Sequence, residues 1–123
     1  MLFRSIDRDS IARAAHRIAS HVRRTPVVDI VIAGIDRPVT LKLELLQHSG
    51  SFKARGAFNT LAALSAGSLV TAASGGNHGA AVAYAAQRLG HRARIFVPEI
   101  SSPAKVARIA SYGAEIEIGR AHV

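Results

Sequence analysis

The sequence contains no cysteine, and it has few aromatic residues and only three lysines. Without cysteine the chain can form no disulfide, and it has no thiolate to act as a nucleophile or as a metal ligand. With only four Phe and two Tyr, the composition gives no sign of an aromatic surface on which nucleic-acid bases could stack. The chemistry of this chain must therefore depend on other side chains.

No apolar run is long enough to cross a membrane, and the first twenty residues contain no apolar core of a signal peptide. These residues are rich in arginine, as in a transit peptide, but Asp7 and Asp9 argue against that interpretation. The 123 residues are 49% hydrophobic and 20% charged, which is ordinary for one globular domain or a part of one. We expect a cytoplasmic protein with no membrane partner.

Acidic residues are scarce, with 8 Asp and Glu against 16 Lys and Arg, so the net charge is +8. Such a charge is compatible with nucleic-acid binding. However, the arginines are spread from Arg4 to Arg120, and only Arg23 and Arg24 are adjacent. This spacing predicts a basic, solvated surface and no nucleic-acid partner, with a nucleic-acid-binding module as a minor alternative.

The histidines give no sign of a metal site. His16 and His21 are five residues apart, so they do not share one face of a helix. His48 and His91 are expected to lie in solvated loops. We therefore predict that the chain binds no metal.

Hydrophobic periodicity and turn residues predict an α/β fold with a parallel sheet in three layers. From residue 69 onward strands and helices alternate with short connections, which is typical of parallel strands joined by crossover helices. The expected helices are Ser10–Val22, Phe52–Leu64, His78–Leu89 and Pro103–Tyr112. The expected strands are Val27–Ile32, Val39–Glu44, Leu69–Ala73, Arg94–Val97 and Glu115–Ile118.

The glycine-rich stretch Ser74–Gly79, with the sequence SGGNHG, joins an expected strand to an expected helix. Such a turn presents free backbone N–H groups and the positive end of the helix dipole, which suits a phosphate or a carboxylate. Ser74, Gly76 and Gly79 also give a near match to the dinucleotide fingerprint, but the first glycine, which the tight turn needs, is absent.

Lys53 lies in the first turn of another expected helix, where the helix dipole disfavours an ammonium ion. A neutral lysine amine is the nucleophile that forms a Schiff base with an aldehyde cofactor. From the residue alone, a solvated surface lysine is the more common interpretation. Glu44 and Arg55 nearby could form an ion pair or lie beside a cofactor, and surface roles are equally compatible with the sequence.

Both stretches resemble motifs of the pyridoxal-phosphate enzymes of the tryptophan-synthase β fold, also called fold type II. Residues 42–57 read KLELLQHSGSFKARGA, similar to the family pattern K-x-E-x-x-Q-x-[ST]-G-S-F-K-x-R-G-A. Residues 74–79 are similar to its S-x-G-N-H-[GA] loop. The match is best to the threonine/serine dehydratases, which are close to the serine racemases. Further positions fit in order: Thr25-Pro26, Gly90, Pro98, Lys105 and Tyr112-Gly113-Ala114.

The resemblance implies a role for each site residue with pyridoxal 5'-phosphate as the cofactor. Lys53 would hold the cofactor as a Schiff base and then move the Cα proton of the substrate. Phe52 would pack beside the cofactor, and Asn77 would hydrogen-bond its ring hydroxyl. The substrate carboxylate would be held by the loop residues Ser74, Gly75, Asn77 and His78.

The implied reaction is the dehydration and deamination of L-serine or L-threonine to a 2-oxo acid and ammonia. In the related racemases a serine follows the first loop serine and acts from the opposite face of the substrate. Gly75 stands there in this chain and has no proton to give, which favours dehydration over the alternative, serine racemase. His78 stands where the cysteine-synthase branch has a threonine, which argues against that branch.

The resemblance covers essentially the whole chain but only about the first third of a family member. Residues from about 40 to 123 would form the small α/β domain, and residues 1–39 would supply a helix and strands to a large domain that is missing. The family's phosphate-binding loop would lie beyond Val123. We therefore expect a truncated N-terminal segment of an enzyme that is homo-oligomeric at full length. The alternative is an inactive fragment that serves only for interaction.

Overall fold

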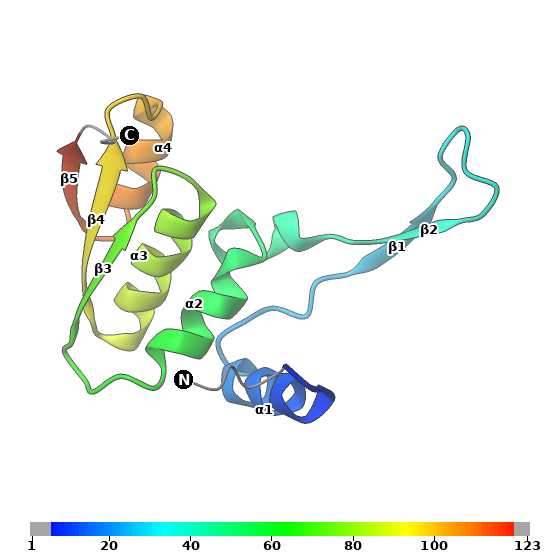
Figure 1. The fold of residues 1–123 in the computed structure, drawn as a ribbon, viewed down its shortest axis with the longest axis horizontal. Coiled ribbons are helices and arrows are strands. Elements are labelled where there is room, and N and C mark those ends of the chain that lie inside the picture. The colour runs from blue at the N-terminus through cyan, green and yellow to red at the C-terminus, as the bar shows by residue number, and fades with distance from the viewer. Residues whose placement is uncertain (1–5, 120–123) are drawn as a thin grey trace.

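The computed structural model describes residues 6–119, and its elements follow the order expected from the sequence (Figure 1). The α-helices are α1 (Arg8–Ile18), α2 (Lys53–Leu61), α3 (Asn77–Leu89) and α4 (Pro103–Ala110). The strands are β1 (Val27–Ile30), β2 (Val39–Lys42), β3 (Leu69–Ala73), β4 (Arg92–Pro98) and β5 (Glu115–Gly119). Two 3₁₀ turns, η1 (Glu44–Leu46) and η2 (His48–Gly50), lie between β2 and α2.

Strands β3, β4 and β5 form a parallel sheet in that order, so the predicted α/β class with a parallel sheet is confirmed. Burial alternates along β4, where Ala93, Ile95 and Val97 are buried and Phe96 is exposed. Helices α3 and α4 both cover the buried face, because Ile95 and Ile109 of α4 meet at the same point of α3. The carboxyl ends of the three strands lie at one edge, where ligands bind in sheets of this kind.

Helix α3 lies at the centre of the packing, between the sheet and α2 (Figure 1). Its small side chains let both neighbours come close, and its buried residues are Gly79, Ala80, Ala81, Val82, Ala83, Ala85 and Ala86. Helix α2 packs on α3 with Phe58 fully buried, and α1 packs on α2. The α1–α2 contact includes a hydrogen bond of 2.7 Å from Arg17 to Asn59, and the ring of His21, in the turn after α1, stacks on Phe58.

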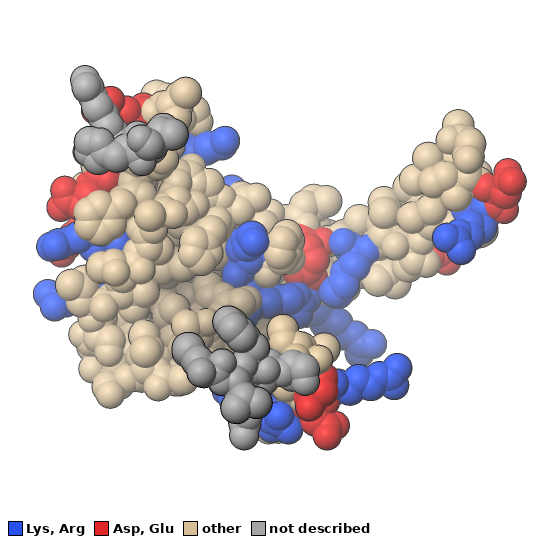
Figure 2. Space-filling view, in the orientation of Figure 1, with Lys and Arg blue, Asp and Glu red and all other residues tan. Residues whose placement is uncertain are grey.

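Strands β1 and β2 form an antiparallel hairpin, residues 27–42, that we call the hairpin arm, and it extends away from the rest of the molecule (Figure 1). Uncharged residues cover much of this arm on the face that Figure 2 shows. Its exposed apolar side chains are Val27, Val28, Val31, Ile32, Ile35 and Leu41. The domain boundary that we predicted near residue 40 lies within β2, and the division into two domains stays a prediction.

The helix starts match the sequence better than the helix ends. Asp7 begins α1 with a capping box, in which it accepts from the backbone N–H of Ser10 while the Ser10 hydroxyl lies 3.0 Å from the N–H of Asp7. However, α1 ends at Ile18 and not at Val22, and α2 ends at Leu61 and not at Leu64. Both helices give way to hydrogen-bonded turns, which apolar periodicity does not distinguish from one more helical turn.

Candidate functional site

Lys53 lies in the first turn of helix α2, as the sequence predicted, and the helix begins at Lys53 itself, one residue after the expected start. Ser51 has the extended backbone of a capping residue, and its hydroxyl accepts from the backbone N–H of Lys53 at 3.3 Å. The side chain of Lys53 is exposed, and its Nζ lies 4.7 Å from the centre of the Phe52 ring. The amine is therefore accessible at the positive end of a helix, beside an aromatic face.

The turn before Lys53 is held from a distance by helix α4. Ser49 has a left-handed backbone with a φ of 57°, and its carbonyl oxygen accepts from the guanidinium of Arg108. The same guanidinium lies against Gly50, where a side chain would overlap it. Residues 59 positions apart in the chain thus fix the approach to Lys53.

The glycine-rich loop lies at the carboxyl edge of the sheet, between β3 and α3. The backbone N–H of Ser74 donates to the carbonyl oxygen of Phe96 at 2.9 Å, and its hydroxyl accepts from the N–H of Gly76 at 3.2 Å. Gly76 caps α3 without a side chain. Gly79 lets the helix approach the loop, because a Cβ there would overlap the carbonyl oxygen of Ser74. These contacts leave the first N–H groups of α3 at the edge of the sheet.

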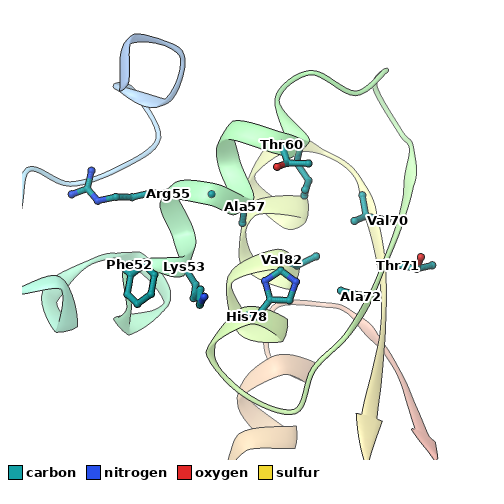
Figure 3. A pocket seen from close by; sticks show the side chains of 12 residues that line it. Phe52, Lys53, Arg55, Ala57, Thr60, Val70, Thr71, Ala72, His78 and Val82 are labelled. Atoms are coloured by element: carbon teal, nitrogen blue, oxygen red, sulfur yellow. The ribbon is translucent and has the colours of Figure 1, made fainter. Parts of the chain in front are cut away.

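A pocket of about 540 Å³ lies between α2, α3 and β3 (Figure 3). The side chains of Lys53 and His78 point into the same space from the starts of two different helices. Phe52 lines the outer end of this pocket, and apolar residues of β3 line the far side. The structure thus brings two adjacent predicted site residues, Phe52 and Lys53, together with a third that lies 25 positions later in the sequence, His78.

Asn77 lines a different and smaller pocket, of about 70 Å³, together with Gly76, Lys105 and Arg108. Ser74 and Gly75 belong to the same loop but line neither pocket. The predicted carboxylate-binding residues are therefore contiguous at the start of α3 but face in different directions. Neither Lys105 nor Arg108 has a site role that the two motifs imply, although their spacing of three places both on one face of α4.

Glu44 and Arg55 form an ion pair, with two hydrogen bonds of 2.7 and 2.8 Å between carboxylate and guanidinium. Thr25 donates its hydroxyl to the same carboxylate, and Lys42 Nζ lies 3.6 Å away. The hydrogen bonds from Arg55 are the main cause that lowers the pKa of Glu44 to about 2, with Thr25 and the charges of Arg55 and Lys42 adding to them. Arg55 lies two residues beyond Lys53, so its pair with Glu44 of η1 fixes the first turn of α2.

Gln47 ties the same region to the segment that precedes β1. Its side chain accepts from the backbone N–H of Arg23 and donates to the Arg23 carbonyl oxygen, both at 2.9 Å. Gln47 is buried, and these two bonds satisfy its side-chain amide. They pair the amide with the Arg23 backbone as a neighbouring strand would pair with it. Arg55 also donates to the carbonyl oxygen of Arg23 at 3.3 Å.

The prediction that His48 and His91 are solvated is wrong, because both rings are partly buried and engaged. His48 stacks on Tyr84, and its Nδ1 lies 3.1 Å from the tyrosine hydroxyl. Burial, followed by the charges of Arg23 and Arg88, lowers the pKa of His48. His91 Nε2 lies 3.2 Å from the carbonyl oxygen of Leu61. Neither contact has a local sequence signal, since the partners are 36 and 30 positions away.

Among residues 6–119 no cluster of metal-binding side chains is present, and no helix is long and apolar enough to cross a membrane.

Comparison with known proteins agrees with the geometry of the site. The family described as "Pyridoxal-phosphate dependent enzyme" matches residues 18–120. The chain belongs to this family. Pyridoxal phosphate is the cofactor of its members, as the two motifs predicted.

Relatives of this pyridoxal-phosphate family member include dehydratases and racemases. The chain is 47% identical over 119 residues to a phenylserine dehydratase of Ralstonia pickettii, a match that covers 89% of this chain and 35% of the relative. The T.th. threonine deaminase superposes with a TM-score of 0.84 at 38% identity, covering 96% of this chain and 38% of the other. Maize serine racemase superposes with a TM-score of 0.83 at 39% identity, covering 95% and 37%.

The chain spans about a third of the length of these relatives. The expected α/β fold of a fold type II enzyme is confirmed at the level of fold and family.

Proposed function

We propose that the chain is the N-terminal part of a pyridoxal-phosphate-dependent ammonia-lyase that converts L-serine or L-threonine to a 2-oxo acid and ammonia. The observation that carries this proposal is the pocket in which the Lys53 amine and the start of α3 face each other. The similarity to a phenylserine dehydratase and to a threonine deaminase supports dehydration as the reaction. In the proposal this part acts within a homo-oligomeric, cytoplasmic protein.

The residues of the pocket fit the chemistry of the cofactor. The cofactor is an aromatic aldehyde that carries negative charge. The pocket offers a primary amine for the aldehyde, an aromatic face for the ring and free backbone N–H groups for an anion. When bound, pyridoxal phosphate supplies an aldehyde that takes up an amine and a ring that withdraws electrons from the substrate Cα.

Lys53 has two roles in the proposal: its Nζ holds the cofactor, and it then moves the proton at the substrate Cα. Phe52, whose ring lies beside the amine, packs against the cofactor and excludes water from that side. Asn77 donates a hydrogen bond to the ring hydroxyl of the cofactor. The loop residues Ser74, Gly75, Asn77 and His78 orient the substrate by binding its carboxylate at the positive end of α3.

Borohydride reduction in the presence of pyridoxal phosphate tests whether this segment keeps a formed pocket. We expect a reduced adduct on Lys53, mapped by peptide mass spectrometry, and none on Lys42 or Lys105. Lys42 is a suitable internal control because its amine already contacts the carbonyl oxygen of Thr25 at 3.0 Å. The variant Lys53→Ala should lose the adduct, whereas Lys105→Ala should keep it. Equal labelling of all three lysines, or none, would contradict a formed pocket.

Serine racemase is the second candidate, because the maize enzyme is similar over most of this chain. Assays of a longer protein that includes the remaining two thirds distinguish the two reactions. Release of 2-oxo acid from L-serine or L-threonine supports the lyase. Formation of D-serine with little 2-oxo acid, measured by chiral chromatography, would favour the racemase and would overturn the interpretation of Gly75.

A further inference from the structure

We propose that Gly75 and Ser101 share one side-chain space beside the glycine-rich loop, and that Ser101 fills this space with a hydroxyl that contacts the amino-acid ligand. The inference rests on the proposed function for the identity of that ligand. It adds to the site a residue that lies 26 positions beyond Gly75, outside both motifs. Ser101 would then help to determine how tightly the loop binds its substrate.

Gly75 is required by the space around it and not by its backbone conformation. Gly75 is not among the residues with positive φ, so its backbone is open to any L-amino acid. A Cβ at this position would overlap the hydroxyl of Ser101 and would lie 2.9 Å from Ser101 Cβ and 3.2 Å from Val97 Cγ1. A residue larger than glycine at position 75 therefore requires Ser101 to give way.

Ser101 is placed at this point by the turn that follows β4. Its backbone N–H donates to the carbonyl oxygen of Pro98 at 2.9 Å, which closes the turn at the carboxyl end of that strand. The neighbouring strand β3 ends at the loop, and the Ser74 N–H donates to Phe96 of β4 at 2.9 Å. The two turns are thus held side by side at the edge of the sheet where ligands bind.

The shared space has a chemical consequence for the loop. A serine at position 75 would place its hydroxyl in this space from the loop itself, whereas here the hydroxyl arrives from the neighbouring turn. A hydroxyl can donate one hydrogen bond and accept others, so it complements the backbone N–H groups that face an anion. We assign to Ser101 Oγ a hydrogen bond to the carboxylate of the bound amino acid.

A thermal unfolding cycle on the chain tests the shared space without reference to activity. Gly75→Ala should lower Tm by roughly 5 °C because it overpacks the turn. In a Ser101→Gly background the same substitution should cost little, because the overlapping atoms are gone. The matched control is a Ser102→Gly background, in which Gly75→Ala should again lower Tm by the full amount. Equal losses in all three backgrounds would overturn the shared space.

Ligand binding tests the hydroxyl. In the chain reconstituted with pyridoxal phosphate and titrated with L-serine, amide NMR shifts of residues 74–78 report the Kd. Ser101→Ala should weaken binding roughly tenfold, as for a hydrogen bond to a charged group, and Ser102→Ala should not. The swap Gly75→Ser/Ser101→Gly should restore binding, because it returns a hydroxyl to the same space.

Two failures of this experiment have different meanings. An unchanged Kd in Ser101→Ala, while the unsubstituted chain binds L-serine, overturns the inference. If the unsubstituted chain responds neither to pyridoxal phosphate nor to L-serine, the proposed function fails and the ligand contact of Ser101 fails with it, whereas the thermal cycle still decides the shared space.

Discussion

Glu44 joins three segments of the chain through a single carboxylate. It accepts hydrogen bonds from Arg55 of α2 and from Thr25, which precedes β1, while it begins η1 itself. Because these hydrogen bonds are stronger to the ionised form, they lower the pKa of Glu44 to about 2 from an ordinary value of 4.5. The sequence left open whether Glu44 and Arg55 pair, and the structure shows that they do.

We predict that Glu44→Gln destabilises the protein by about 2 kcal/mol at neutral pH, because Arg55 loses its charged partner. Since the folded-state pKa lies below the unfolded value, the stabilisation from Glu44 is full above about pH 5 and is lost as the pH falls toward 2. The difference between the two proteins should therefore shrink over this range, as measured by urea unfolding at several pH values.

Glu117→Gln is the control for this prediction, because its carboxylate is exposed and lies 4.0 Å from Arg94. We expect no more than a few tenths of a kcal/mol from that change. A constant difference between Glu44→Gln and the unsubstituted protein from pH 7 to pH 2 would contradict the assignment of the acid dependence to Glu44.

Helix α3 has the role of a spacer between the sheet and α2. Ala81, Ala83, Ala85 and Ala86 have no exposed surface, so the neighbours on both sides pack directly against the helix backbone. The same helix begins at the glycine-rich loop and carries Tyr84, whose ring meets those of Phe58 and Tyr112 edge to face. The position of the loop thus depends on the packing of the whole helix.

We predict that Ala85→Leu destabilises the chain by about 2–3 kcal/mol, because no space exists for the added atoms. Gln87→Leu introduces the same side chain on the exposed face of the same helix, so it should change stability by less than about 0.5 kcal/mol. Thermal or denaturant unfolding of the two variants gives the comparison. Equal stability of both would show that α3 does not pack as tightly as described.

Local rules predicted the element starts, but the division of the site into two pockets was not predictable. Pro103 and Gly90 act as the first helical residue and the left-handed helix end that their residue types indicate, whereas the N-cap of α2 is Phe52 and not Ser51. By contrast, the directions of Asn77 and His78 depend on the backbone angles of the turn before α3 and on the position of α4. Those are set by packing between segments far apart in the sequence, for which the motif has no signal.

At the scale of the whole molecule, the hairpin arm is the part that packs least against other elements. Val31 is 84% exposed and Val27 is 62% exposed, and the arm is a two-stranded sheet with a free edge on each side. A hairpin of this kind is marginal in water without a third strand or a helix against it. The 123-residue chain therefore presents apolar surface and unpaired strand edges together.

We predict that the 123-residue chain associates with itself as its concentration rises, which sedimentation velocity can measure. Val31→Thr combined with Leu41→Thr should reduce this association, because both side chains are exposed on the arm. Replacing an exposed residue outside the arm, as in Arg88→Gln, should leave it unchanged. A chain that sediments as a monomer at every concentration would contradict this prediction.

The order of strands in the parallel sheet also bears on how the protein is made. Strands β3, β4 and β5 are neighbours in the sheet in the same order as in the chain, and α3 and α4 connect them directly. Each new segment that leaves the ribosome can therefore add to a partner already synthesised, without waiting for a distant one. The hairpin arm emerges earlier but finds no such partner within the described residues, so it is the segment that we expect a chaperone to bind during synthesis.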